Sequence, residues 1–425
     1  MRKPCWKAML LLVAFALVAA ACGDDNESAA SATQATTAQT TTTTAADPFA
    51  ALLAAPDEPK AGVIRIGTTP SYDDRLWSYA ESIGMDTRIG LDLEVIPFVD
   101  IPYVPLQNDE IDMLFSCQIC YGTIIENFPE YRNYLISNQY QGFVLIGRAG
   151  ETVVYADALA ANGGDVEAAK AELAESFRGK EFVKTEGFPT TFERGLLENI
   201  GLEFVIDDPS RQDVVFKYYA SLDTMNFSYI NGEADYYTGD LSAQARMLFS
   251  EELAGQFVVA APLELFGSSA ILYSTEGVRA GWLDENPETA LRSLAIWYRA
   301  SRYLEEFPEI VGDYVGEEAK DQTGGTSLGS AVTGRILTEL NYFPLLSEAE
   351  AYMFTPGELT YFGNVVGDSF EAGRDEGYIP PGIEWQDYEV EEVWFNMLLA
   401  RQDLVDWINA PLGSGVGPNG DDPAS

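Results

Sequence analysis

The sequence predicts an α/β fold of two lobes joined by a hinge, with a helical C-terminal extension. Two observations predict it: β-branched strand patterns alternate with helical patterns over residues 61–150, and the alternation restarts over residues 151–260. Residues 261–410 then return the chain to the first lobe and are mainly helical. The 425 residues, 47% of them hydrophobic, can fill two or three domain-sized cores.

The first part of lobe I, residues 61–150, opens with a strand and a helix. Ser71 can cap that helix with Asp74 as the returning acid, and Gly84 ends it. Asp73 and Asp74 are expected to balance the dipole of its first turn. Because strands alternate with helices, we expect a largely parallel sheet. The predicted strands span residues 63–67, 91–98 and 111–116, with one or two more in 134–146.

Lobe II, residues 151–260, begins with a polar, alanine-rich helix that resembles an insertion between the lobes. Its predicted helices span residues 157–176, 189–200 and 222–230, with one more from 241. Its predicted strands span residues 180–184, 213–219, 234–237 and 256–260.

A strand over residues 268–274 is expected to re-enter lobe I. Beyond it we expect helices over residues 287–307, 326–340 and 360–372. The glycine- and proline-containing tail, residues 411–425, is expected to be disordered.

The N-terminus predicts export and lipid anchoring. Residues 1–21 form a basic start and a short apolar run, typical of a signal peptide and too short to span a bilayer comfortably. The run ends in three alanines before Cys22, which resembles a bacterial lipoprotein signal with Cys22 as the lipidated residue, a palmitate carrier. An ordinary signal peptide with an incidental cysteine is the alternative. Residues 22–60, rich in Thr and Ala, predict a disordered tether.

Charge and composition exclude several classes of function. The net charge is −42, and removal of three basic residues with the signal peptide leaves about −45 (−42 − 3). This charge disfavours nucleic acid and anionic lipid surfaces as partners, so a lipid anchor is the expected membrane contact. The chain contains no histidine, which excludes imidazole catalysis and most zinc sites. We expect no metal, no cofactor and no enzymatic activity.

Four segments resemble the sulfonate/nitrate/thiamine-precursor group of substrate-binding proteins. They are VIRIGTTPSYDD, YAESIGMDTRIGLDLEVIPF, NDEIDMLFS, and RGKEFVKTEGFPTTFERGLLENIGL with INGEADYYTGD. The resemblance covers roughly residues 63–340. It implies the type II periplasmic binding protein fold, a small solute held between two lobes, and delivery to the permease of an ABC importer outside the cytoplasm. We expect a monomer.

In lobe I, candidate ligand contacts follow the predicted strands, where open α/β sheets place their ligands. Thr68, Thr69 and Tyr72 follow the first strand, although this loop can also serve only to shape a turn and cap a helix. By resemblance, Ser116, Cys117 and Gln118 form a second ligand loop. Cys117 and Cys120 can form a disulfide outside the cytoplasm or remain two buried thiols. Metal binding is not expected, because two thiols without histidine are too few ligands, and redox catalysis is not expected, because a thioredoxin-like sequence context is missing.

In lobe II, Thr190 with Glu193 fits a capping box, and by resemblance the free N–H groups there and the Thr191 hydroxyl face the ligand. Tyr237 can stack on a flat ligand and Asp240 can pair with an amine, unless the tyrosine is core and the aspartate a helix cap.

The solute class follows from charge. No basic cluster falls on these loops, so we expect a neutral, aromatic or cationic solute, pyrimidine-like or amine-bearing, over a sulfonate. Two alternatives remain at this stage: an enzyme similar to thiamine-pyrimidine synthases, and a sensory lipoprotein that uses the same cleft without transport.

Overall fold

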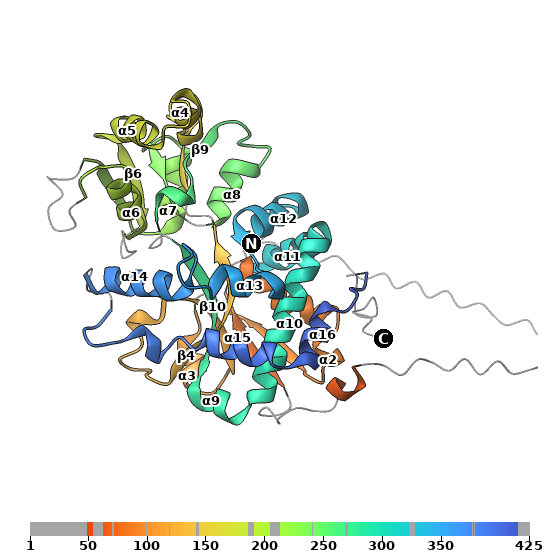
Figure 1. The fold of residues 1–425 in the computed structure, drawn as a ribbon. Coiled ribbons are helices and arrows are strands. Elements are labelled where there is room, and N and C mark those ends of the chain that lie inside the picture. The colour runs from red at the N-terminus through yellow and green to blue at the C-terminus, as the bar shows by residue number, and fades with distance from the viewer. Residues whose placement is uncertain are drawn as a thin grey trace, which may run out of the picture. The chain divides into compact units, whose positions relative to one another are not determined.

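The computed structural model contains two mixed α/β lobes, each built on its own sheet (Figure 1). The sheets have six and five strands within the described part of the chain. The residues that the structure describes are 49–53, 63–69, 72–98, 101–118, 120–141, 144–185, 191–204, 213–239, 241–267, 271–322, 328–375, 377 and 379–414. Cys22 and the predicted signal peptide lie outside these residues.

Lobe I is built on a sheet with the strand order β11-β4-β10-β3-β1-β2. The strands are β1 (Ile64–Thr68), β2 (Leu93–Pro97), β3 (Met113–Cys117), β4 (Tyr131–Tyr140), β10 (Leu272–Arg279) and β11 (Asn341–Tyr342). β1 pairs in parallel with β2 and β3, whereas β10 is antiparallel to both β3 and β4, and β11 is antiparallel to β4. The expected largely parallel sheet is therefore wrong. The chain re-enters lobe I at the carboxyl ends of β3 and β4, so β10 must run the opposite way.

The sequence predicts the first helix of lobe I, whereas the other short helices up to residue 123 were not predicted. Their bounds are η3 (Asp73–Arg75), α1 (Leu76–Ser82), α2 (Met85–Arg88), α3 (Tyr103–Gln107) and η4 (Cys120–Thr123). Leu76, Ala80 and Ile83 are buried, as the helical spacing predicts, and Gly84 follows α1 with a φ of 74°.

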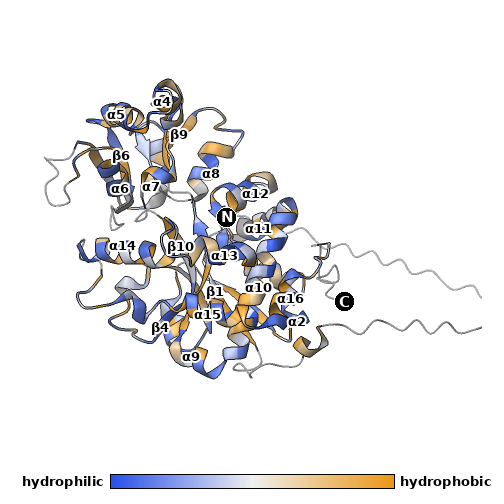
Figure 2. Ribbon diagram, in the orientation of Figure 1, coloured by the Kyte–Doolittle hydropathy of each residue, from blue (hydrophilic) through white to orange (hydrophobic). Residues whose placement is uncertain are grey.

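The returning chain covers lobe I with helices. They are α9 (Ala280–Glu285), α10 (Pro287–Glu306), α11 (Pro308–Gln322) and α12 (Ser330–Glu339). The central helix is α10, which begins with Pro287 at its first position and buries Trp297 against Trp77 of α1, with ring centroids 5.0 Å apart. Every residue from 289 to 301 is buried, so α10 is covered on all sides there, although hydrophilic as well as hydrophobic residues occur along it (Figure 2).

Lobe II is built on a sheet with the order β7-β6-β8-β5-β9. Its strands are β5 (Leu145–Arg148), β6 (Glu181–Thr185), β7 (Val215–Tyr219), β8 (Tyr236–Tyr237) and β9 (Phe257–Ala261). Its helices are α4 (Tyr155–Ala161), α5 (Val166–Phe177), α6 (Thr191–Asn199), α7 (Leu222–Ile230), α8 (Leu241–Phe249) and η6 (Leu263–Leu265). The single helix expected over residues 157–176 is two helices, and α5 buries Leu173 and Phe177 in the lobe II core. β5 precedes residue 150, so this sheet begins upstream of the expected boundary.

The C-terminal extension packs on lobe I. It contains α13 (Leu346–Met353), α14 (Phe362–Asp375), η8 (Trp385–Asp387), α15 (Glu391–Leu399) and α16 (Gln402–Asn409). Trp407 of α16 is fully buried, and Arg299 of α10 donates to its carbonyl at 2.6 Å. Two residues of the tail that was expected to be disordered also bond to α10. The Pro411 carbonyl accepts from Arg299 at 2.9 Å, and the Gly413 N–H donates to the Tyr303 hydroxyl at 2.7 Å.

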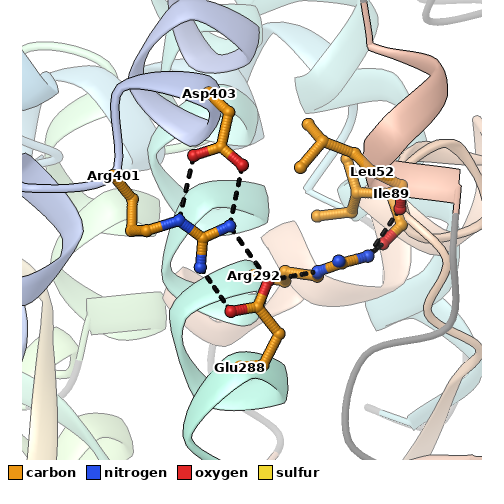
Figure 3. Close-up of polar contacts among 6 residues, drawn as sticks. All are labelled: Leu52, Ile89, Glu288, Arg292, Arg401 and Asp403. Atoms are coloured by element: carbon orange, nitrogen blue, oxygen red, sulfur yellow. Dashed lines mark hydrogen bonds and ion pairs between the residues drawn. The ribbon is translucent and has the colours of Figure 1, made fainter.

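One arginine network joins both ends of the folded chain to α10 (Figure 3). Arg292 donates to the carbonyls of Leu52 and Ile89, and it pairs with Glu288, which also binds Arg401. Leu52 belongs to η1 (Ala50–Leu53), inside the expected tether, yet only 2% of its surface is exposed. The tether expectation is therefore wrong here, because a short apolar run can bury a side chain inside a polar segment.

Among the described helices, none combines the length and the apolar character needed to cross a bilayer.

Candidate functional site

In lobe I, the strands that carry the predicted residues end at one edge of the sheet, where β2 also ends because it is parallel to β1. β1, β3 and β4 point the same way, because β1 is parallel to β3 and β10 is antiparallel to both β3 and β4. Their last residues are Thr68, Cys117 and Tyr140. In an open α/β sheet this edge is where ligands bind, so the predicted lobe I residues lie at the expected place in the fold.

The loop after β1 is fixed by its own acid and by the following arginine. Asp74 accepts from the Thr69 backbone N–H at 2.6 Å and from the Thr69 hydroxyl at 3.1 Å. Arg75 donates to the Thr68 hydroxyl at 3.2 Å and to the Thr69 carbonyl, and it pairs with Glu318. Thr68 and Thr69 therefore shape the loop. Asp74 lies in the first turn of η3, as predicted, but it is fully buried.

Asp73 bonds to two neighbouring strands and, through Asn138, is linked to a third. Its carboxylate accepts from Asn138 of β4 at 3.2 Å and from Ser274 of β10 at 2.9 Å. Asn138 also donates to the side chain of Asn341 on β11 at 2.9 Å. Asp73 lies in the first turn of η3, as predicted, and is 4% exposed. Ser71, the predicted cap, lies outside the described residues, and Tyr72 is buried.

Burial raises the pKa of two carboxyl groups in this region. Desolvation is the main cause of the rise in the pKa of Asp74 to about 8; Arg75 opposes it, and Asp73 adds to it. Burial likewise raises the pKa of Glu276 well above its usual value, although the Trp77 indole N–H donates to it at 3.0 Å. Of the two, Asp74 is expected to be largely protonated near neutral pH.

The second lobe I loop is tightly braced. Cys117 and Cys120 form a disulfide, which decides between the two alternatives that the sequence left open. The Gln118 amide donates to the Ile271 carbonyl at 2.8 Å and to the Ser369 hydroxyl at 3.3 Å, and it accepts from the Tyr273 N–H. Ser116 bonds to the Tyr103 hydroxyl at 2.7 Å. Within the described structure, Gln118 therefore binds β10 and α14.

In lobe II, the first predicted loop rests on a buried ion pair. Lys184 near the end of β6 donates to both carboxylate oxygens of Glu193 in the first turn of α6, at 2.8 Å each. The exposed fractions of the two side chains are 7% and 1%. Thr191 begins α6, whereas Thr190 lies outside the described residues.

The end of β8 carries the second predicted loop. The Tyr237 hydroxyl donates to Asn226 at 2.6 Å and its ring lies 5.1 Å from that of Tyr229, so Tyr237 belongs to the lobe II core. Asp240 lies outside the described residues. The Gly239 carbonyl between them accepts from Gln244 at 2.9 Å and from Tyr140 of lobe I at 3.3 Å. This carbonyl therefore joins the end of β4 to the end of β8.

Several site features escaped the sequence analysis. Glu193 was interpreted as a capping acid, although a lysine at the end of a strand followed by an acid in the next helix was visible as a possible pair. The Tyr140–Gly239 contact and the Asp73 network join distant segments and leave no local pattern. Among the described residues, no group of three acidic or cysteine side chains is placed to hold a metal ion.

No protein-family model matches the chain, and no curated protein sequence is similar to it. Solved structures are similar in fold. The periplasmic aliphatic sulphonate-binding protein SsuA of Escherichia coli is 11% identical, with a TM-score of 0.52 over 77% of this chain and 91% of that chain. The zinc-bound ligand-binding component of an ABC-type import system from Staphylococcus aureus is 12% identical, with a TM-score of 0.51 over 78% and 97%.

The periplasmic nitrate-binding protein NrtA of Synechocystis PCC 6803 is 13% identical, with a TM-score of 0.50 over 81% of this chain and 90% of that chain. These likenesses span both lobes and nearly the whole length of each known protein. The chain therefore has the type II fold of the solute-binding components of ABC importers, the fold that the sequence resemblance implies.

Proposed function

We propose that this protein is the extracytoplasmic solute-binding component of an ABC importer. The observation that carries the proposal is the pairing of two α/β lobes whose strand ends meet at Tyr140 and Gly239. Open α/β sheets bind ligands at the carboxyl ends of their strands, so two such edges in contact are suited to enclose one solute. The fold shared with binding components of importers supports the same function.

The proposed partner is a permease in the same membrane, and the protein is tethered there through lipid on Cys22. The sequence of residues 1–22 supports this location, and a tether permits a folded body to reach a membrane partner. Replacement of Cys22 by serine is expected to release the protein from the membrane fraction without altering solute affinity.

The proposed activity is binding without catalysis. The absence of histidine from the sequence removes the commonest general base. Among the described residues, Arg75 in the segment after β1 and Lys184 near the end of β6 are paired with carboxylates. An anionic solute would have to compete for these cations. A neutral, aromatic or cationic solute is therefore the proposed ligand.

Isothermal titration calorimetry with a panel of amines, pyrimidines and sulfonates tests the proposal. We expect one class to bind with a micromolar or lower dissociation constant, and deletion of the gene to abolish cellular uptake of that same solute. Unchanged uptake of the solute in the deletion strain would contradict the proposed transport function.

A further inference from the structure

Besides the Tyr219 hydroxyl on β7, two buried polar atoms in lobe II have no hydrogen-bond partner in the described structure. They are the hydroxyl oxygen of Thr238 and the side-chain carbonyl oxygen of Gln244. Thr238 is 5% exposed and Gln244 is fully buried. Native proteins pair the large majority of such groups, so each one without a partner calls for an explanation.

The orientation of the Gln244 amide follows from its neighbour. Its nitrogen donates to the Gly239 carbonyl at 2.9 Å, and a carbonyl can only accept. Turning the amide around would set two oxygen acceptors against each other. The Gln244 oxygen is therefore held away from Gly239 and can form a hydrogen bond only with a donor.

Both groups lie in the segment that leads from the end of β8 into α8. Thr238 directly follows β8, and Gln244 lies in α8, which begins two residues after Gly239 (Figure 1). The Gly239 carbonyl also accepts from the Tyr140 hydroxyl at the end of β4 in lobe I. The unpartnered atoms thus flank the point at which the strand ends of the two lobes meet.

We propose that Thr238 and Gln244 form the lobe II half of the solute site and select a solute that carries N–H or O–H donors, such as an amine, amide or alcohol. This inference rests on the proposed function and specifies its ligand. The Gln244 oxygen accepts from the solute, and the Thr238 hydroxyl supplies a second contact as donor or acceptor. An acceptor-only anion, such as nitrate or an alkanesulfonate, leaves the Gln244 oxygen unpaired and is disfavoured.

The pairing of two cations, one in each lobe, agrees with this selection. Lys184, near the end of β6, uses its ammonium group on both oxygens of Glu193. Arg75 donates to Thr68, the Thr69 carbonyl and Glu318. Neither cation is held ready for an anion, so discrimination falls to neutral hydrogen-bonding groups.

The test compares matched solutes that differ by one donor group. The pairs are 2-aminoethanesulfonate with ethanesulfonate and 4-aminopyrimidine with pyrimidine, titrated into the full mature chain by calorimetry. We expect the donor-bearing member of at least one pair to bind at least tenfold more tightly than its partner. Thr238→Val and Gln244→Leu are each expected to weaken that binding by tenfold or more.

Stability separates a ligand role from a structural one. Thr238→Val removes a hydroxyl without a partner, so its unfolding midpoint without solute is expected to equal or exceed that of the wild type. Thr275→Val is the matched control, because the Thr275 hydroxyl is buried and donates to Asn133 at 3.0 Å. The control is expected to lower the midpoint and to leave the dissociation constant unchanged.

Two results distinguish the inference from the function on which it rests. If the acceptor-only member binds as tightly as its partner, or if Thr238→Val binds normally, the protein remains a solute-binding protein and this inference is wrong. If the wild type binds no member of the panel and takes no part in uptake, the proposed function is lost as well.

Discussion

The buried pair of Lys184 and Glu193 gives the sharpest prediction on stability. Replacing Glu193 with leucine removes the partner of an ammonium group that is only 7% exposed. Two charge-assisted hydrogen bonds of 2.8 Å are lost at once, and the lysine is left with a buried, uncompensated charge. Removing one member of a buried pair costs about 3–5 kcal/mol.

A loss of that size is easily measured. At about 2 °C per kcal/mol, the smallest slope for domains of up to about 250 residues, the thermal midpoint is expected to fall by at least about 6 °C. Differential scanning calorimetry measures the midpoint, and denaturant titration gives the free energy of unfolding. The pair also fixes the first turn of α6 to the end of β6, so solute affinity is expected to fall with stability.

A double-mutant cycle isolates the ion pair from packing. Lys184→Met with Glu193→Leu removes both charges, and the double variant is expected to be more stable than Glu193→Leu alone. Glu252→Leu is the matched control in the same lobe, because the pair of Glu252 with Arg246 is exposed and worth about 0–1 kcal/mol. A cost below about 1 kcal/mol for Glu193→Leu, equal to that of the control, would refute the reasoning.

Three further predictions concern lobe I. Replacing both Cys117 and Cys120 with serine is expected to lower the free energy of unfolding by about 2 kcal/mol, the chain-entropy value for a loop of about four residues; equal stability with and without reductant would contradict it. The raised pKa of Asp74 keeps its carboxyl group protonated in the folded state up to about pH 8, whereas in the unfolded chain it ionises near pH 4. The free energy of unfolding is therefore expected to fall between about pH 4 and pH 8, by about 1.4 kcal/mol per pH unit. Asp74→Asn is expected to flatten this part of the curve of unfolding free energy against pH, and an unchanged slope would count against it. Arg292→Met, which removes the bonds to the Leu52 and Ile89 carbonyls, is expected to speed amide hydrogen exchange in residues 49–53, and unaltered protection there would contradict the network in Figure 3.

Local signals in the sequence predicted most elements of the fold. The helix expected over residues 222–230 matches α7 at both ends, since Ser221 caps it by accepting from the Thr224 N–H. The start of α10 was equally clear from Pro287. Both signals are short-range and lie within one turn of the helix end.

Elements defined by tertiary contacts were harder to predict. The short helices α15 and α16 were not predicted; neither has a side-chain cap, and each buries a tryptophan, Trp394 and Trp407, against lobe I. The strand expected over residues 268–274 is β10 at Leu272–Arg279, where pairing with β3 and β4 on both sides sets its bounds. Strand direction likewise depends on where the chain re-enters the sheet, which no local pattern encodes.

In the candidate site too, local features were predictable from the sequence and tertiary contacts were not. The sequence correctly placed Thr68 and Cys117 at strand ends, but it did not reveal their partners. The bond between Asn138 and Asp73 joins residues 65 positions apart, and that between Gln118 and Ile271 joins residues 153 apart. Hydrogen-bonding groups alone therefore suggested ligand contacts where the fold uses the same groups to brace its loops.

Native mass spectrometry of the mature chain, purified without denaturation from the cells that produce it, tests the central claim most directly. The account predicts a complex with one small organic solute bearing N–H or O–H groups, which dissociates when the protein unfolds. A chain that carries an acceptor-only anion would contradict the proposed ligand class. A chain that stays at its own mass, even after incubation with extracts of the growth medium, would contradict solute binding itself.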